Sequence, residues 1–248
     1  MCDDSAMTPS LTNSLVLWDI DHTLLSIGSV SREIYTCAFE KTTGSPPQAI
    51  APMTGRTERA IIIDTLEMNG YPSDETVVSA FYRSLGDAAH RLKDRMAVHG
   101  RALPGGREAI KLIRAAGGTQ SLVTGNIRPI AVAKLQAFGL TDGLEIDTGG
   151  YGDLSNDRSR LVESAIDRTG RRLGISFTPA DTVVIGDTPL DVEGAHRAGA
   201  AVIAVATGTS SLGELLDAGA DRAVTDLSDG VRLVELISEL TPRSARER

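Results

Sequence analysis

LVLWDIDHTLL, residues 15–25, joins an apolar run to two carboxylates, Asp19 and Asp21. Aspartate is a poor strand former and is rarely buried without a partner. The apolar run predicts a buried strand, and its acidic end has two interpretations. Either the strand leads into an ordinary acidic turn, or it delivers two carboxylates to a site. The rest of the sequence decides between them.

Beyond residue 119, short apolar runs alternate with amphipathic stretches. The strand candidates are 119–126, 144–147, 181–187, 201–208 and 222–225. The stretches between them predict helices; one of these places Ile127, Ile130, Ala131, Lys134, Leu135 and Phe138 at helical spacing. Such alternation predicts an α/β fold: a Rossmann-like parallel sheet flanked by helices on both faces.

The segment between residues 27 and 99 lacks this alternation. It offers three helix candidates, at 31–44, 56–70 and 74–96, and no convincing strand. A helical block directly after the first strand of an α/β pattern predicts an inserted domain. The expected parts are an α/β core (13–26 and 100–241), an all-helical insert (27–99) and flexible tails (1–12 and 242–248).

Charge and composition exclude several classes of function. The net charge of −8 and the pI of about 5.1 provide no basic surface for nucleic acid. The apolar runs are too short to span a membrane, and the acidic N-terminus does not resemble a secretory signal. Two cysteines, Cys2 and Cys37, are too few for a disulfide scaffold. The expected location is therefore a reducing cytoplasm.

Three polar clusters follow strand candidates: residues 19–23, 124–126 and 186–191. Each alone is typical of a turn or a helix cap, because Asp, Asn and Thr side chains bond nearby backbone amides. A fourth cluster, 157–160, opens a helix and adds positive charge. In a parallel α/β sheet, however, ligands bind beyond the carboxyl ends of the strands. The clusters are therefore expected to lie on one common edge of the sheet.

Such an edge would crowd Asp19, Asp21, Asp187 and Asp191 together. Carboxylates this close raise one another's pKa unless a positive charge intervenes. Mg²⁺ is the economical answer, because it takes oxygen ligands and usually shares its shell with a substrate phosphate. The Thr124 hydroxyl and a nearby guanidinium could hold the other phosphate oxygens. The clusters together thus predict a phosphate site with a divalent cation.

The ordered set D-x-D-x-T (19–23), Thr124, a basic residue and G-D-x-x-x-D (186–191) resembles the haloacid dehalogenase superfamily of phosphohydrolases. The resemblance covers about residues 14–240 and is closest to the phosphoglycolate-phosphatase-like branch, which has a helical cap domain. It implies a Mg²⁺-dependent phosphatase that hydrolyses a small phosphomonoester, phosphoglycolate-like or a sugar phosphate, through an aspartyl-phosphate intermediate.

The resemblance also implies a role for each matching residue. Asp19 would attack phosphorus, and Asp21 would protonate the leaving alkoxide and later accept a proton from water. The implied metal ligands are Asp19, the Asp21 carbonyl, Asp187 and Asp191, the last binding directly, through water or by orienting the shell. The implied phosphoryl-binding residues are Thr124, Gly125, Asn126 and Arg158, with Thr23 supporting the loop.

The sequence departs from the family pattern at two positions. His22 stands where glycine is frequent and is interpreted as loop chemistry rather than as a base. The basic position is arginine, and both Arg158 and Arg160 are candidates, with Arg158 preferred. In the cap, Gly55 and Arg56 could hold a second anionic group of the substrate, but an ordinary helix start explains them equally well.

Alternative functions remain open at this point. A sugar-phosphate mutase would use the same aspartyl-phosphate, and a phosphonate hydrolase would need a cap lysine, for which Lys41 and Lys93 are available. A non-catalytic phosphate-binding protein is a more remote alternative. The expected partner is a small phosphorylated metabolite, with no nucleic acid and no membrane, and the chain could act as a monomer or a homodimer.

Overall fold

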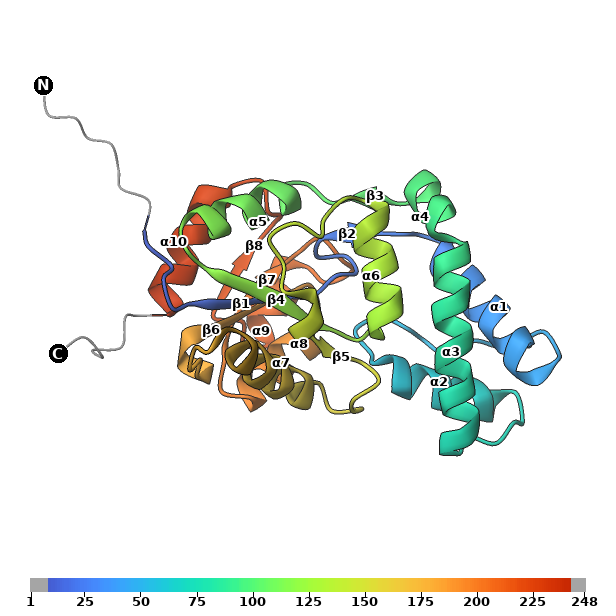
Figure 1. The fold of residues 1–248 in the computed structure, drawn as a ribbon. Coiled ribbons are helices and arrows are strands. Elements are labelled where there is room, and N and C mark those ends of the chain that lie inside the picture. The colour runs from blue at the N-terminus through green and yellow to red at the C-terminus, as the bar shows by residue number, and fades with distance from the viewer. Residues whose placement is uncertain (1–8, 242–248) are drawn as a thin grey trace, which may run out of the picture.

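A computed structural model describes residues 9–241, with a six-stranded parallel sheet at its centre (Figure 1). The strand order is β5–β4–β1–β6–β7–β8. The strands are β1 (Leu15–Trp18), β4 (Thr119–Thr124), β5 (Gly150–Tyr151), β6 (Thr182–Gly186), β7 (Ala201–Val205) and β8 (Arg222–Val224). The predicted α/β class is confirmed.

β1 lies inside the sheet, and its alternating side chains build a core on each face. Leu15 and Leu17 pack beneath one layer of helices, and Val16 and Trp18 beneath the other. The first layer is α7 (Arg158–Leu173), α8 (Pro189–Arg197) and α9 (Leu212–Asp217). The second is α5 (Gly106–Ala115), α6 (Arg128–Ala137) and α10 (Gly230–Leu240). Burial on both faces explains why this strand is apolar throughout.

Four helices follow one another between two short antiparallel strands, β2 (Leu25–Ser26) and β3 (Arg101–Ala102). They are α1 (Val30–Thr43), α2 (Glu58–Met68), α3 (Glu75–Arg91) and α4 (Lys93–His99). The Phe39 ring packs edge-on against Tyr71 and Phe81, with centroid separations of 5.5 and 6.2 Å. α3 also packs against α6, as Figure 1 shows, so this helical unit shares a core with one face of the sheet.

Two predicted elements differ from the structure. Residues 144–147 form no strand; a 3₁₀ turn covers Ile146–Thr148, and the edge strand β5 follows it. β5 begins on glycine because the backbone passes close to α7: a Cβ on Gly150 would lie 2.0 Å from the Leu161 carbonyl oxygen. The single helix predicted over 74–96 is two helices that meet at Leu92.

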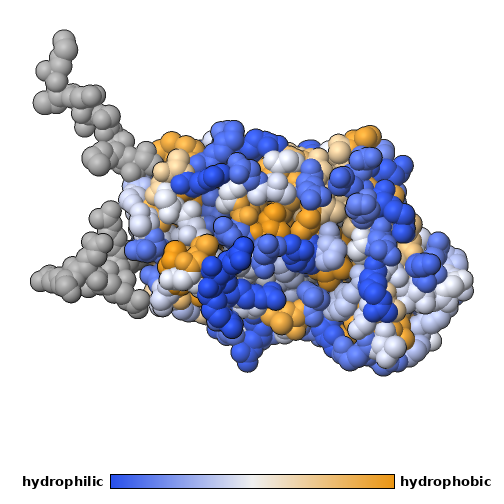
Figure 2. Space-filling model, viewed as in Figure 1, coloured by the Kyte–Doolittle hydropathy of each residue, from blue (hydrophilic) through white to orange (hydrophobic). Residues whose placement is uncertain are grey.

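The packed structure begins earlier than expected. Leu11 is fully buried, and its amide donates to the Ala116 carbonyl at 2.8 Å, so residues 9–12 do not form a tail. The remaining predicted tail residues, 1–8 and 242–248, lie outside the described part of the chain. Among the described helices, none is long and apolar enough to cross a membrane. The face in Figure 2 is mostly hydrophilic, with hydrophobic residues in small separate groups.

Candidate active site

The loops after β1, β4 and β6 meet at one edge of the sheet. β1 pairs in parallel with β4 on one side and with β6 on the other, so the carboxyl ends of all three strands are adjacent. The direction of chain progression also reverses here, because β4 and β5 extend the sheet one way and β6 to β8 the other. Open α/β sheets bind ligands at such a switch point. The predicted common edge is thus the place where Asp19, Thr124 and Asp187 come together.

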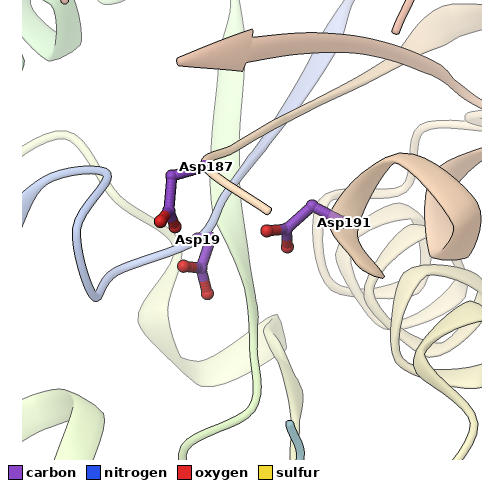
Figure 3. Close-up of side chains that lie close together, drawn as sticks. All are labelled: Asp19, Asp187 and Asp191. Atoms are coloured by element: carbon purple, nitrogen blue, oxygen red, sulfur yellow. The ribbon is translucent and has the colours of Figure 1, made fainter. Parts of the chain in front are cut away.

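Asp19, Asp187 and Asp191 form a buried cluster at this point (Figure 3). One carboxylate oxygen from each lies within 4.8 Å of the others. Asp191 is fixed by the start of α8, as its Oδ2 accepts hydrogen bonds from the Thr188 amide at 3.0 Å and the Thr188 hydroxyl at 2.6 Å. Thr188 is the N-cap of α8, and Pro189 is its first residue.

Arg158, the first residue of α7, is the counter-charge of this cluster. Its Nη2 donates to Asp19 Oδ1 at 3.0 Å, and the same guanidinium forms an ion pair with Asp191. Its Nη1 donates to the Gly55 carbonyl at 3.3 Å, which ties it to the helical insert. Arg160 instead forms an exposed ion pair with Glu163. Of the two arginine candidates, the structure therefore brings Arg158 to the acidic cluster.

Burial is the main cause that raises the pKa of Asp19, with the neighbouring charge of Asp191 adding to it and Arg158 opposing it. Burial likewise raises the pKa of Asp187, and the Asp19 and Asp191 charges add to the effect. Asp187 Oδ1 accepts from the Thr23 hydroxyl at 3.4 Å, but Oδ2 is buried and no described group donates to it. A buried carboxylate oxygen without a donor fits a cation ligand, and an all-oxygen set suits Mg²⁺.

Asp21 points away from this cluster, toward Lys134 on α6. Lys134 Nζ lies 2.8 Å from Asp21 Oδ1 and 2.6 Å from Oδ2, and Asn126 Nδ2 donates to Oδ2 at 2.7 Å. Burial opposes ionisation of Asp21, but the Lys134 charge and these hydrogen bonds outweigh it, so the pKa of Asp21 is lowered. The two carboxylates of D-x-D therefore lie in different electrostatic environments, Asp19 beside two further carboxylates and Asp21 beside an ammonium group.

Asn126 and Thr124 support this arrangement. Asn126 Oδ1 accepts from Lys134 at 2.7 Å, and its Nδ2 also donates to the Thr124 hydroxyl oxygen at 2.8 Å. The Thr124 hydroxyl oxygen accepts a second hydrogen bond, from the backbone N–H of Asn126, at 3.3 Å. Its hydroxyl proton is therefore available to donate. Asn126 was predicted to bind phosphate, yet its amide group is already bonded to Asp21, Lys134 and Thr124.

Gly125 forms the contact between the core and the helical insert. A Cβ at this position would lie 2.1 Å from the Arg56 carbonyl oxygen, so only glycine allows this approach. The Gly125 carbonyl accepts from the Glu58 amide at 2.7 Å, and the Gly152 carbonyl accepts from the Arg59 amide at 3.1 Å. Two amides in the first turn of α2 thus donate to the core, where a helix otherwise leaves donors unsatisfied.

A pocket of about 120 Å³ lies between the insert and this edge of the sheet. Gly55 and Arg56 line it as predicted candidates, but the Arg56 guanidinium bonds Asp64 at 2.6 Å and the Pro52 carbonyl at 3.2 Å. Glu58, which is only 6% exposed, and Tyr35 also line the pocket, and the Tyr35 hydroxyl donates to Glu58 Oε2. The roles assigned to Gly55 and Arg56 stay predictions.

His22 lies at the mouth of this pocket and is exposed. Its φ of 60° is in the left-handed region, which few residues other than glycine adopt readily. Its amide donates to Leu25 at 2.7 Å, and its carbonyl accepts from the Thr207 hydroxyl. The backbone conformation explains why glycine is frequent here in the family that the sequence resembles, and it supports the interpretation of His22 as loop chemistry.

Sequence reasoning missed three pocket residues, Lys134, Glu58 and Tyr35. The sequence places Lys134 only among apolar residues at helical spacing, and a lysine in such a set is itself a signal of a buried partner. Glu58 and Tyr35 carry no such signal, because both occur at ordinary helical positions of the insert.

Comparison with known proteins identifies the family. The family model of haloacid dehalogenase-like hydrolases matches residues 16–196. Among curated proteins, none matches the sequence.

Solved structures show the same fold at low sequence identity. A hydrolase from Pseudomonas syringae is 20% identical with a TM-score of 0.65, covering 90% of this chain and 99% of its own. A beta-phosphoglucomutase candidate from Bacteroides vulgatus is 19% identical with a TM-score of 0.65, and the match covers 94% of this chain and 92% of its own. A predicted phosphoglycolate phosphatase from Haemophilus somnus is 18% identical with a TM-score of 0.58, covering 90% and 98%.

Proposed function

Because the chain belongs to the haloacid dehalogenase-like hydrolase family, we propose that it is a Mg²⁺-dependent phosphatase that hydrolyses a small phosphomonoester. The observation that carries this proposal is the position of Asp19. It lies at the end of β1, beside a guanidinium and two more carboxylates, and two residues from a carboxylate in a different electrostatic environment. An acidic turn with only a structural role would need none of these partners.

In the proposed reaction, Asp19 attacks phosphorus while the bond to the ester oxygen breaks, and the leaving oxygen takes a proton from Asp21. Water then attacks the phosphorus of the aspartyl-phosphate, Asp21 accepts its proton, and Asp19 is regenerated with release of inorganic phosphate. The Arg158 bond to Asp19 Oδ1 leaves Oδ2 for the attack. The Thr124 hydroxyl and Arg158 would donate to the phosphoryl oxygens.

Asp19, Asp187 and the Asp21 carbonyl would hold the magnesium ion, with Asp191 orienting Arg158 and the shell. When bound, the ion supplies positive charge that offsets the charge of the phosphoryl group during transfer. The donor-free Asp187 Oδ2 is the feature of this chain that supports a cation here.

The helical unit of residues 27–99 would act as the cap domain that covers the substrate, on a core of residues 13–26 and 100–241. We place the protein in the cytoplasm, as a monomer or homodimer, with a small phosphorylated metabolite as its partner. The similar structures include both a phosphatase and a mutase candidate. A sugar-phosphate mutase that uses the same nucleophile is therefore the second hypothesis. A phosphonate hydrolase is less well supported, since neither Lys41 nor Lys93 lines the pocket.

The experiment that tests the proposal is hydrolysis of an aryl phosphate with added Mg²⁺. Asp19→Asn is expected to lower the rate by ~10³-fold or more, because the amide cannot attack phosphorus. EDTA is expected to remove the activity of the unmodified protein. Asp142→Asn, the same change at an 89% exposed surface carboxylate, is the matched control and should keep full activity.

Full activity in Asp19→Asn would refute the phosphatase proposal. Transfer of phosphate to a second sugar phosphate instead of to water, seen by product analysis, would favour the mutase.

A further inference from the structure

The helical insert contributes one carboxylate to the pocket, that of Glu58. The pocket is also lined by apolar residues, Ile27, Ile34, Met53 and Ile61 from the insert and Ile130 from α6. Glu58 is the first residue of α2. The hydrogen bond from its backbone N–H to the Gly125 carbonyl fixes its position next to the loop of residues 124–126. Glu58 therefore lines the same pocket as Asp19, next to the loop of residues 124–126.

Glu58 has no cation of its own. Within residues 9–241, no lysine, arginine or histidine forms an ion pair with it, and Tyr35, which donates to Oε2, is the one side chain that hydrogen-bonds to it. No described group donates to Oε1. Burial raises the pKa of Glu58 to about 7 despite the Tyr35 hydrogen bond and the Lys134 charge. Oε1 is therefore able to accept a hydrogen bond from a ligand in the pocket.

The cations of the pocket are already paired with carboxylates. Lys134 binds Asp21, Arg56 binds Asp64, and Arg158 binds Asp19 and Asp191. Above the pKa of Glu58, a substrate carboxylate next to it would thus meet a second negative charge and no free lysine or arginine. This arrangement disfavours substrates such as phosphoglycolate, in which a carboxylate lies close to the phosphoester.

We propose that Glu58, held by Tyr35, accepts a hydrogen bond from the leaving group, so that the substrate is a phosphomonoester of an alcohol bearing a hydroxyl or ammonium donor. This inference rests on the proposed phosphatase function and assigns its substrate class. The apolar residues that line the pocket would contact the carbon chain of that alcohol. A site built around a hydrogen-bonding group discriminates strongly against analogues that lack the donor, because the buried group is then left unpaired.

The test compares kcat/KM for alkyl phosphates with two- and three-carbon chains that end in methyl, hydroxyl, ammonium or carboxylate. The unmodified protein should prefer the better donor-ended ester over the methyl-ended one by about tenfold or more, and over the carboxylate-ended one by about a hundredfold. A higher value for ammonium identifies an amino alcohol, and a higher value for hydroxyl identifies a polyol or sugar.

Glu58→Gln should reduce the ratio over the carboxylate-ended ester to within about threefold of unity, because the amide has no charge and can donate to a carboxylate; the ratio over the methyl-ended ester should fall less, because the amide oxygen still accepts. Tyr35→Phe should weaken the preference less, since Oε2 then becomes available to the ligand. The matched control is Glu75→Gln, the same change at the first residue of α3, where the side chain is 73% exposed. It should leave every ratio unchanged.

The outcomes separate this inference from the proposed function. If Asp19→Asn abolishes hydrolysis of an aryl phosphate but the methyl- or carboxylate-ended esters match the donor-ended ones, the inference fails and the phosphatase stands. The inference also fails if none of the alkyl esters is hydrolysed, or if Glu58→Gln leaves the ratios unchanged. If Asp19→Asn retains aryl phosphatase activity, both fail.

Discussion

At the scale of single residues, hydrogen bonds to both carboxylate oxygens fix the position of Asp21 and also favour its ionised form. Lys134 reaches both of its oxygens, and Asn126 reaches one of them. These bonds favour the ionised carboxylate in the free protein, whereas the proposed role requires a proton on Asp21 when the alkoxide leaves. The negative charge of a bound phosphoryl group would raise the pKa of Asp21 again, so substrate binding itself would promote protonation.

Lys134→Met tests whether this pair positions Asp21. The side chain of methionine has similar bulk but no charge, so Asp21 would lose two of its three bonds. We expect kcat to fall by about tenfold to a hundredfold, as misplacement of a reacting group typically does, with a smaller change in KM. The pKa of Asp21 should rise, which moves the pH dependence of kcat/KM toward higher pH. Steady-state kinetics across pH measures both effects.

The control for this variant is Lys111→Met, which removes a 62% exposed lysine from a surface ion pair with Glu108. Surface pairs of this kind contribute little, so its kinetics should match those of the unmodified protein. An unchanged kcat and pH profile in Lys134→Met would show that the pair has only a structural role.

The residues of the site differ in how far the sequence could predict them. Asp19 and Asp187 directly follow strands and Thr124 ends one, and neighbouring parallel strands bring these ends together. Arg158 needed the further argument that it opens a helix. The bond between Asn126 and Asp21 joins side chains 105 positions apart, and no local pattern predicts such a pairing.

At the scale of elements, the first turn of α2 joins the insert to the core. The amides of Glu58 and Arg59 donate to the carbonyls of Gly125 and Gly152, and Thr57 caps the helix with its side chain. This contact places Glu58 and Arg56 over the loop of residues 124–126. A small shift of α2 would therefore change the shape of the pocket, although the same residues would line it.

Gly125→Ala tests this contact, because its Cβ would lie 2.1 Å from the Arg56 carbonyl oxygen. The new methyl group would meet a backbone atom and not the end of a flexible side chain, so α2 must move away. We expect kcat/KM for the preferred substrate to fall by about a hundredfold, while thermal unfolding of the core changes little.

Gly213→Ala is the comparison, since the nearest atom to its Cβ would be the Ser211 hydroxyl at 4.0 Å. In α9 this change should leave activity intact and stabilise the helix slightly, by about 0.5–1 kcal/mol. Equal activity of the two variants would argue against docking of α2 as a requirement for catalysis.

Elements were predictable where the pattern of apolar residues was long enough. The central strands and the helices after them each bury a continuous or periodic set of side chains, and these matched. The strand expected at 144–147 did not form, because the sheet edge requires close approach to α7, which Gly150 permits and a side chain would block. Apolar character alone does not report such a steric requirement.

At the scale of the whole molecule, the site combines charges from three distant parts of the chain. Three carboxylates, those of Asp19, Asp187 and Asp191, face one guanidinium, that of Arg158. The order of the motifs along the sequence was enough to predict that they share one edge of the sheet. The depth of their burial was not predictable, and burial is the largest cause of the raised pKa values of Asp19 and Asp187.

These raised pKa values make the metal-free protein less stable as pH rises. Above the ordinary aspartate pKa of 3.8, both carboxyl groups lose their protons in the unfolded chain but keep them in the folded state. Each group therefore lowers the free energy of unfolding as pH rises, until the pH passes its raised pKa. The slope is at most about 1.4 kcal/mol per pH unit for each carboxyl group. In EDTA, the Tm should therefore fall between about pH 5 and about pH 8.

Mg²⁺ should reverse this loss, because a cation binds the ionised carboxylates and competes with protons for them. The rise in Tm on adding Mg²⁺ is expected to be larger at pH 8 than at pH 5, measured by differential scanning calorimetry. Asp187→Asn should remove most of the rise and flatten the pH dependence in EDTA, whereas Asp142→Asn at the surface should change neither. A rise in Tm that is equal at both pH values, or that persists in Asp187→Asn, would place the ion elsewhere than on these carboxylates.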